Sequence, residues 1–144
     1  MKKRIGIFET NSSSTHSCVI SDKCKLYDTI TPDDRGQITI EYGEYGWEQE
    51  SYRDPYSKAC YALTLTQYQS RKEVGLGMLK ELLVEHTGAT EVVFKEQSSE
   101  WHPKGYVDHQ SVDDMIEEIF ASKESLKSFI FNPNSSFETD NDNH

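Results

Sequence analysis

The sequence predicts a single compact α+β domain in which three or four helices pack on a small, mostly antiparallel sheet. A chain of 144 residues is long enough for one real hydrophobic core and too short for two ordinary domains. Alternating segments typical of strands and apolar stripes typical of helices follow each other irregularly, without an internal repeat. We expect the domain to span residues 1–139 and residues 140–144 to form a short acidic tail.

The N-terminal part combines two short predicted strands with an unusual polar segment between them. Residues 4–8 and 18–20 are apolar enough to form strands, and the segment from Phe8 to Ser17 is dense in hydroxyl and amide side chains. Such side chains bond either to their own backbone or to the oxygens of a ligand. We call this segment the serine run and treat it as the first candidate site. Its candidate residues are Glu9, Asn11, Ser12, Ser13, Ser14, Thr15 and His16.

The next region is predicted to be a β-hairpin followed by an ordered loop. Residues 26–30 and 37–42 alternate in polarity on either side of a run of turn-forming residues. The residues expected on the buried face of the second strand are Ile38, Ile40 and Tyr42. Residues 43–52 are aromatic and acidic without a consistent period, which indicates a loop. Trp47 and the tyrosines there could stack on a base or on a partner, but buried aromatic anchors are the more common outcome.

Two helices in the middle of the chain are predicted from their start and stop signals. Asp54 is a favourable cap before Pro55, which suits the first position of a helix. Ser70 and Glu73 have the spacing of a capping box, and Gly88 is suited to end the helix that follows them.

A strand at residues 91–95, a polar loop and two further helices complete the predicted fold. Ser111 is a suitable cap for a helix whose apolar face runs from Val112 to Phe120. Ser122 can cap a last helix that ends before Pro133.

Two further polar segments are candidate sites. Asp108, His109, Gln110 and Ser111 precede the helix at Val112, and a helix N-terminus attracts anions. An aspartate beside a histidine is also the pairing that orients an imidazole for proton transfer. The other segment contains Asn132 and Asn134. A loop with a capping network is the alternative interpretation of the first segment, and we expect that segment to be a neighbour of the serine run in space.

Composition argues against several classes of function. The formal net charge is -10, whereas proteins that grip nucleic-acid phosphates need clustered lysine and arginine. The basic cluster at residues 2–4 is followed by too short an apolar stretch for a signal peptide or a membrane anchor. The three cysteines suit neither a disulfide framework nor a zinc ribbon, because their number is odd and no two are closely spaced. We expect a cytoplasmic protein that binds neither nucleic-acid phosphates nor membranes.

The cofactor stays unknown because the sequence strongly implies none, and no metal site is predicted. Asp140 and Asp142 carry the oxygen atoms that hard cations prefer, but the glycine and the final glutamate of an EF-hand loop are missing. A frayed acidic tail is the simpler interpretation, and these two residues stay as weak metal candidates.

Three motifs carry a resemblance to a known family. The segment Phe8 to Ser17 is similar to the N-terminal signature of uncharacterised proteins encoded by bacteriophages and by bacteria that carry prophages. Residues 106–111 and 131–135, with the acidic segment 140–143 close behind, add further matches. The resemblance implies a phage origin and the cytoplasm of a host cell, and it implies no activity.

Three hypotheses for the function follow. The first is a small acidic phage-type accessory protein that binds a host or phage protein, which an acidic surface favours over DNA binding. The second is a phosphate- or nucleotide-binding enzyme in which the three polar segments form one Ser/Thr/His-rich cleft. The third is that the serine run is only a structural brace. We rank the accessory protein above the enzyme, because the sequence contains no Walker glycine pattern and no nucleophile elbow.

Overall fold

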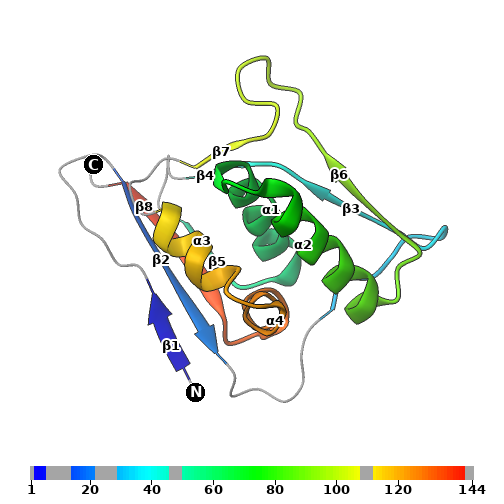
Figure 1. Cartoon of the computed structure of the whole chain (residues 1–144), viewed down its shortest axis with the longest axis horizontal. Helices are drawn as coiled ribbons and strands as arrows, with labels where there is room; N and C mark the ends of the chain where they lie inside the picture. The colour runs from blue at the N-terminus through cyan, green and yellow to red at the C-terminus, as the bar shows by residue number, and fades with distance from the viewer. Residues whose placement is uncertain (1, 6–13, 22–28, 46–49, 108–111, 142–144) are drawn as a thin grey trace.

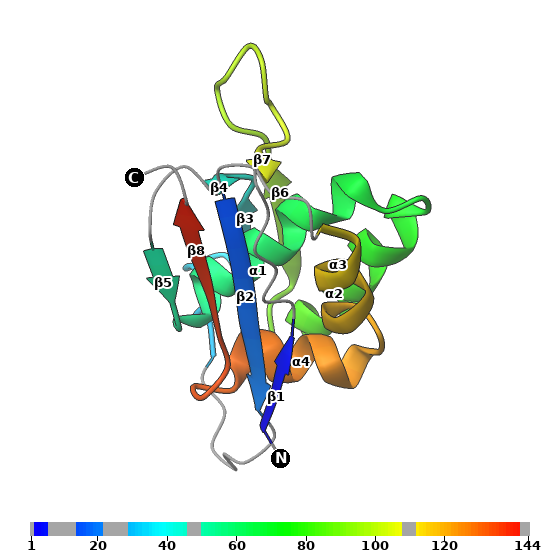
Figure 2. The same ribbon diagram turned by 90° about the vertical axis from the view of Figure 1, so that its left-hand side faces the viewer.

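The computed structural model describes residues 2–5, 14–21, 29–45, 50–107 and 112–141. Within them, the predicted α+β fold class is confirmed. A four-stranded antiparallel sheet lies on one side of the helices, and a pair of parallel strands lies on the other side (Figures 1 and 2). The central helix, α1 (Pro55–Leu65), is enclosed between these two layers, which explains why every residue from Lys58 to Leu65 is buried.

The four-stranded sheet brings segments from both ends of the chain together. Its two middle strands are antiparallel, with Cys18 opposite Phe137, and the side chains of both residues are in the core. In spatial order the strands are β1 (Lys2–Ile5), β2 (Ser14–Ser21), β8 (Ser136–Asn141) and β5 (Glu50–Tyr52).

Three parts of this sheet differ from the sequence-based expectation. β2 begins at Ser14, so the second half of the serine run is a strand. β5 lies within the segment 43–52, which the sequence predicts to be a loop. β8 runs to Asn141 and so includes the first two residues of the expected tail. In each case, pairing with a strand far away in the sequence stabilises a segment that has no clear strand pattern of its own.

The remaining strands form two short parallel pairs, and this corrects the predicted hairpin. Among the described residues, β3 pairs with β6, and Thr29 and Ile30 of the predicted partner segment are in no strand; residues 22–28 lie outside the described ranges. β4 and β7 make the second pair. The bounds of these strands are β3 (Gln37–Glu41), β6 (Glu91–Lys95), β4 (Glu44–Tyr45) and β7 (Tyr106–Val107).

The turn before β3 forms as predicted but leads to a different partner. Gly36 N donates to Asp33 O at 2.9 Å, and Gly36 has a φ of 79°, which glycine adopts without strain. Thr90 N then donates to Gly36 O at 2.7 Å and so starts the parallel pairing of β3 with β6. The predicted buried face of β3 is confirmed for Ile38, Ile40 and Tyr42.

The helices begin and end mostly where their local signals predict. Ser57 N donates to the Asp54 carboxylate at 2.8 Å at the start of α1. Ser125 N donates to Ser122 Oγ at 3.0 Å at the start of the last helix. Gly88, with a φ of 76°, ends the second helix. The other helices are the 3-10 turn η1 (Thr66–Tyr68), α2 (Lys72–Thr87), α3 (Val112–Ile119) and α4 (Lys123–Phe131).

The capping box predicted from Ser70 and Glu73 is wrong. α2 begins at Lys72, and its N-cap residue, Arg71, makes no side-chain capping bond. The reason is that η1 extends the preceding helical segment to Tyr68, so Ser70 lies in the corner between η1 and α2.

Aromatic rings connect the central helix to the four-stranded sheet. Tyr61 of α1 stacks on Phe137 of β8 with 3.9 Å between ring centroids, and Tyr52 of β5 stacks on the same ring at 4.7 Å. Tyr45 meets Tyr61 edge to face at 5.1 Å. Tyr45 is therefore the kind of buried aromatic anchor that the sequence predicts for residues 43–52, whereas Trp47 lies outside the described residues.

Candidate functional site

Most of the predicted polar cluster lies outside the part of the chain that the structure describes. This holds for Glu9, Asn11, Ser12 and Ser13 and for Asp108, His109, Gln110 and Ser111. The weak metal candidate Asp142 also lies outside the described residues. The predicted proximity of the serine run and the segment 108–111 therefore stays a prediction.

The described end of the serine run pairs with the C-terminal strand. Ser14, Thr15 and His16 lie opposite Asn141, Asp140 and Thr139, respectively. The described pairing of these strands ends with Val19 opposite Ser136, the first residue of β8. Because a strand rises about 3.3 Å per residue, Ser14 lies roughly 15 Å or more from the turn that precedes Ser136. That turn contains Asn132 and Asn134, so the structure does not bring these two residues into one site with the start of β2.

The turn with Asn132 and Asn134 surrounds a buried ammonium group. Lys58 is fully buried in α1, and its Nζ donates to the carbonyl oxygens of Asn132 and Ser135, at 2.9 Å each. Asn132 is fully buried as well, and its Oδ1 accepts from Asn134 N at 2.9 Å. For this motif, the geometry fits a hydrogen-bonded structural brace that fixes the entry into β8.

Sequence reasoning missed Lys58, although a signal was present. Residues 59–65 are apolar on nearly every face of a helix, which indicates a helix buried on all sides. A lysine at the start of such a run must either reach solvent or find acceptors inside the protein. The carbonyl groups of the turn supply those acceptors.

The described thiols are poor nucleophiles. Cys18 and Cys60 are buried, and burial raises the pKa of Cys18 to about 12, with a smaller effect of the Glu118 carboxylate. Burial also raises the pKa of Cys60, although its hydrogen bonds lower it in part. Because the thiolate is the reactive form, neither residue is suited to covalent catalysis.

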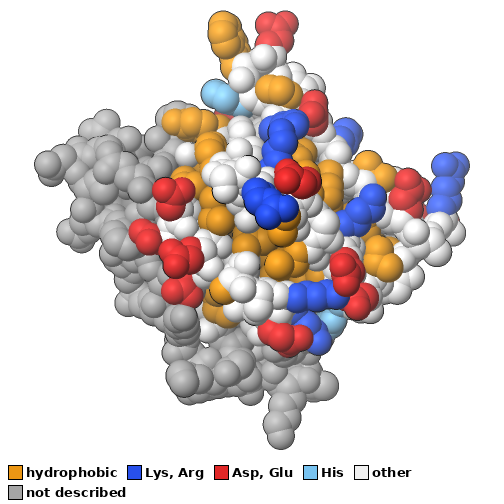
Figure 3. Space-filling view, viewed as in Figure 1, with side chains coloured by type: hydrophobic (Ala, Val, Ile, Leu, Met, Phe, Trp, Pro, Cys, Tyr) orange, Lys and Arg blue, Asp and Glu red, His pale blue; other side chains and the backbone are white. Residues whose placement is uncertain are grey.

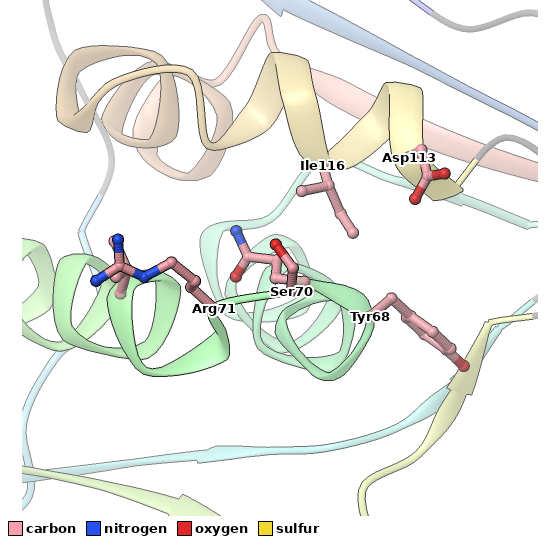
Figure 4. A pocket seen from close by; sticks show the side chains of 7 residues that line it. Tyr68, Ser70, Arg71, Asp113 and Ile116 are labelled. Atoms are coloured by element: carbon pink, nitrogen blue, oxygen red, sulfur yellow. The ribbon is translucent and has the colours of Figure 1, made fainter.

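A groove of about 430 Å³ lies between the η1–α2 corner and α3. Tyr68 forms one end, where its hydroxyl accepts from Val107 N at 3.0 Å, and Asp113 lies in the first turn of α3. After the segment 108–111, Asp113 and Ile116 line the groove, and before it Val107 contacts the groove residue Tyr68. Its lining residues are Tyr68, Gln69, Ser70, Arg71, Val74, Asp113 and Ile116 (Figure 4).

The chemistry of this groove is mixed. Ser70 and Arg71 at the N-terminus of α2 suit an acidic group, but Asp113 across the groove opposes one. The Arg71 guanidinium is largely exposed and 4.0 Å from the Glu73 carboxylate, which weakens its attraction for a ligand. Gln69 Oε1 is buried and has no hydrogen-bond partner among the described residues, so this oxygen is not exposed to a ligand in the groove. These groups do not converge on one class of ligand.

The other prominent feature is a loop, residues 96–105, that projects from the body between β6 and β7 (Figure 1). Trp101 in this loop is 86% exposed, the highest value among the large hydrophobic residues described. Figure 3 shows hydrophobic and acidic side chains on the projecting lobe at the top of the molecule. We call residues 96–105 the Trp101 loop.

Both ends of the Trp101 loop are attached to neighbouring residues of one chain segment. Tyr42 N donates to Lys95 O at 3.1 Å, and Tyr106 N donates to Gly43 O at 3.0 Å. The loop therefore connects two successive parallel strand pairs, β3 with β6 and β4 with β7. This arrangement fixes the direction in which the loop leaves the domain.

Hydrogen bonds within the Trp101 loop hold its shape. Gln97 N donates to Pro103 O at 2.9 Å, and the Gln97 amide donates to His102 O at 2.7 Å and to Glu44 Oε2 at 2.8 Å. Ser99 Oγ accepts from the backbone N–H groups of Trp101 and His102, at 3.3 and 3.1 Å. The backbone around Trp101 is thus ordered although its ring is exposed.

Gly105 closes the loop at a position where only glycine fits. Its φ is 73°, and a Cβ there would lie 2.1 Å from Gly43 O. The Gln67 amide donates to Lys104 O at 2.5 Å and to Gly105 O at 3.2 Å, which joins the loop to the helical layer. The sequence predicts a polar loop here, and the signal for Trp101 was the presence of a large aromatic residue in an otherwise polar segment.

Comparison with protein-family models, with curated proteins and with solved structures found no match for this chain. None of the described helices is long and apolar enough to cross a membrane.

Proposed function

We propose that this protein acts by binding another protein and that the Trp101 loop is the central contact. The observation that carries the proposal is the 86% exposure of Trp101 on a loop with an ordered backbone. Tryptophan is among the residues most buried on average and is enriched at the energetic centres of protein interfaces. A hydrogen-bonded loop also reduces the entropy that is lost when the contact forms.

The expected contribution of Trp101 is large for a single residue. A tryptophan side chain buries roughly 150–250 Å², which is worth about 4–6 kcal/mol at 25 cal/mol per Å². Part of this energy offsets the cost of association, so truncation of such a residue typically costs about 2 kcal/mol or more. We therefore expect Trp101→Ala to weaken binding roughly thirtyfold.

The charges near the Trp101 loop favour a basic partner. Glu44, Glu96 and Glu100 are exposed, Lys104 is the only lysine or arginine of the loop, and the whole chain has a net charge of -10. A partner with an apolar recess and a rim of lysine and arginine would match these charges. Binding should then weaken as salt is raised, because exposed charges are screened over roughly 8 Å at physiological ionic strength.

The biological setting of this proposal is a small accessory protein of phage type that acts on a host or phage protein in the cytoplasm. It rests on the sequence resemblance and on the acidic composition. The alternative, a phosphate- or nucleotide-binding enzyme, relies mostly on the serine run and on residues 108–111. The mixed chemistry of the groove beside Arg71 does not favour that alternative.

Site-specific photocrosslinking tests the proposal. A photoreactive amino acid at position 101 is expected to give a discrete crosslinked protein in bacterial cells, which mass spectrometry then identifies. The same amino acid at position 74 is the control, because Val74 is also exposed, at 48%, but lies in the groove. The crosslink at position 101 should decrease as salt is raised in cell extracts.

The outcomes at the two positions separate the hypotheses. A crosslink at position 101 but not at position 74 supports the Trp101 loop as the contact. Crosslinking only at position 74 would move the binding site to the groove. Equal background labelling at both positions, with no discrete product, would overturn the proposal.

A further inference from the structure

The outer edge of β6 is the second surface that suggests a partner. Among the described residues, β6 pairs with β3 alone, and Figure 1 shows no described element beyond β6 on its other side. Unpaired strand edges present a row of backbone donors and acceptors that can pair with another chain. The occupant of this edge can be inferred from the sequence of the strand.

The hydrogen bonds of β6 show which backbone groups point outward. Glu91 N donates to Gly36 O, and Lys95 O accepts from Tyr42 N, so the odd-numbered residues of β6 direct their backbone groups at β3. Successive residues of a strand alternate in direction. The N–H and C=O groups of Val92 and Phe94 therefore point away from β3.

We propose that β6 pairs antiparallel with β6 of a second copy of this chain, about a two-fold axis at Val93. In this register Val92 lies opposite Phe94 of the second copy, and the reverse pair is equivalent by symmetry. These are the residues whose outward backbone groups are available, so each pair exchanges two hydrogen bonds. A closed two-fold contact of this kind uses one self-complementary patch on both copies.

The side chains of β6 match the same register. Glu91 and Lys95 are exposed and equally far from Val93, so Glu91 of each copy faces Lys95 of the other. On the opposite face, Phe94, which is only partly buried in the monomer, would lie beside Val92 of the second copy, and Val92 is already buried in its own monomer. Cross-strand pairs of opposite charge and of aromatic with β-branched residues both stabilise antiparallel sheets.

Other registers fit less well. A two-fold axis at Val92 or at Phe94 also pairs outward-facing backbone groups, but it places Val93 opposite Glu91 or Lys95. In these registers neither Glu91 nor Lys95 faces an opposite charge on the second copy. Lys95 Nζ would keep only its contact with Glu41 Oε1, at 3.7 Å within one copy. Because a five-residue strand is a small contact, we expect a dimer that dissociates on dilution.

Charge exchange tests the pairing by sedimentation velocity over a range of protein concentrations. The single variants Glu91→Lys and Lys95→Glu place like charges opposite each other twice per dimer, and each is expected to raise the dimer dissociation constant about tenfold or more. The double variant restores opposite charges and should recover the dimer. A monomer at all concentrations, or a dimer that Glu91→Lys does not weaken, would overturn the proposal.

Disulfide trapping tests the register independently. Residues that face each other without hydrogen bonds across an antiparallel pair have Cα atoms about 4.5 Å apart, within the range of a disulfide. In a Cys24→Ser background, Val93→Cys should form a covalent dimer under mild oxidation, because the remaining native thiols, Cys18 and Cys60, are buried. Thr39→Cys in β3 is the matched control and should stay monomeric. Equal crosslinking of both variants, or none of Val93→Cys, would exclude the proposed axis.

Discussion

Replacement of Lys58 by methionine tests the role of the buried ammonium group. Lys58 Nζ donates to the carbonyl oxygens of Asn132 and Ser135, at 2.9 Å each, where α4 gives way to β8. Methionine keeps a similar volume and an unbranched chain but provides no donor. The variant therefore removes these hydrogen bonds while it largely preserves packing.

The magnitude follows from the two carbonyl groups that lose this donor. The Asn132 carbonyl keeps its hydrogen bond from Ser135 N at 2.9 Å, so the loss is that of two hydrogen bonds to a charged donor, about 1.5–3 kcal/mol each, and the relief from burying a charge offsets part of the sum. We expect a net loss of about 3 kcal/mol in the free energy of unfolding. For a domain of this size, the corresponding decrease in Tm is roughly 10 °C.

Thermal melts followed by circular dichroism measure this effect. Lys80→Met is the matched control, because Lys80 is exposed on α2, and its variant should melt within about 2 °C of the wild type. A Lys58→Met variant that melts as the control does would refute the brace and would show that the turn at Asn132 holds its shape without the ammonium group.

Two further pairs of measurements test other parts of the account. Gly105→Ala should destabilise the protein by about 2 kcal/mol or more, because φ at Gly105 is 73° and the new Cβ would meet Gly43 O. Gly77→Ala is the control and should stabilise α2 by about 0.5–1 kcal/mol, because no atom lies within 4 Å of the new Cβ. Equal effects of the two variants on urea unfolding would argue against the tight fit at Gly105. The pKa of Cys18 rises from 9.0 to about 12 on folding, so the folded state binds the proton more tightly and stability should fall as pH rises above about 9, by up to about 1.4 kcal/mol per pH unit. In thermal melts between pH 8 and 11, the Tm of Cys18→Ala should therefore decline less steeply than the Tm of the wild type. Equal slopes would contradict the raised pKa of Cys18.

The parts of the fold that the sequence predicts correctly depend on local chemistry. Asp54 and Ser122 cap their helices through hydrogen bonds to residues three positions later, and such spacings are visible in any sequence. Gly88 ends α2 for a similarly local reason, its positive φ. The strand at residues 91–95 is confirmed with its predicted bounds, because it contains three β-favouring residues in a row.

The parts that sequence analysis misses depend on contacts between distant segments. β3 pairs with β6 some fifty residues away, although a nearby alternating segment offered a hairpin partner. Lys58 becomes a brace only because the turn at Asn132 folds against α1. The exposure of Trp101 likewise depends on how the loop leaves the domain, which the pairing of Tyr42 and Gly43 decides. No local pattern contains this information.

The proposed function is tested most directly by the affinity of the Trp101→Ala variant for the protein that crosslinks at position 101. Isothermal titration calorimetry with the purified pair gives the dissociation constants of the wild type and of the variant, and matched Tm values show that the variant is folded. The proposal predicts a dissociation constant roughly thirtyfold higher for Trp101→Ala. A value within about twofold of the wild type, at an unchanged Tm, would contradict the assignment of the Trp101 loop as the binding contact.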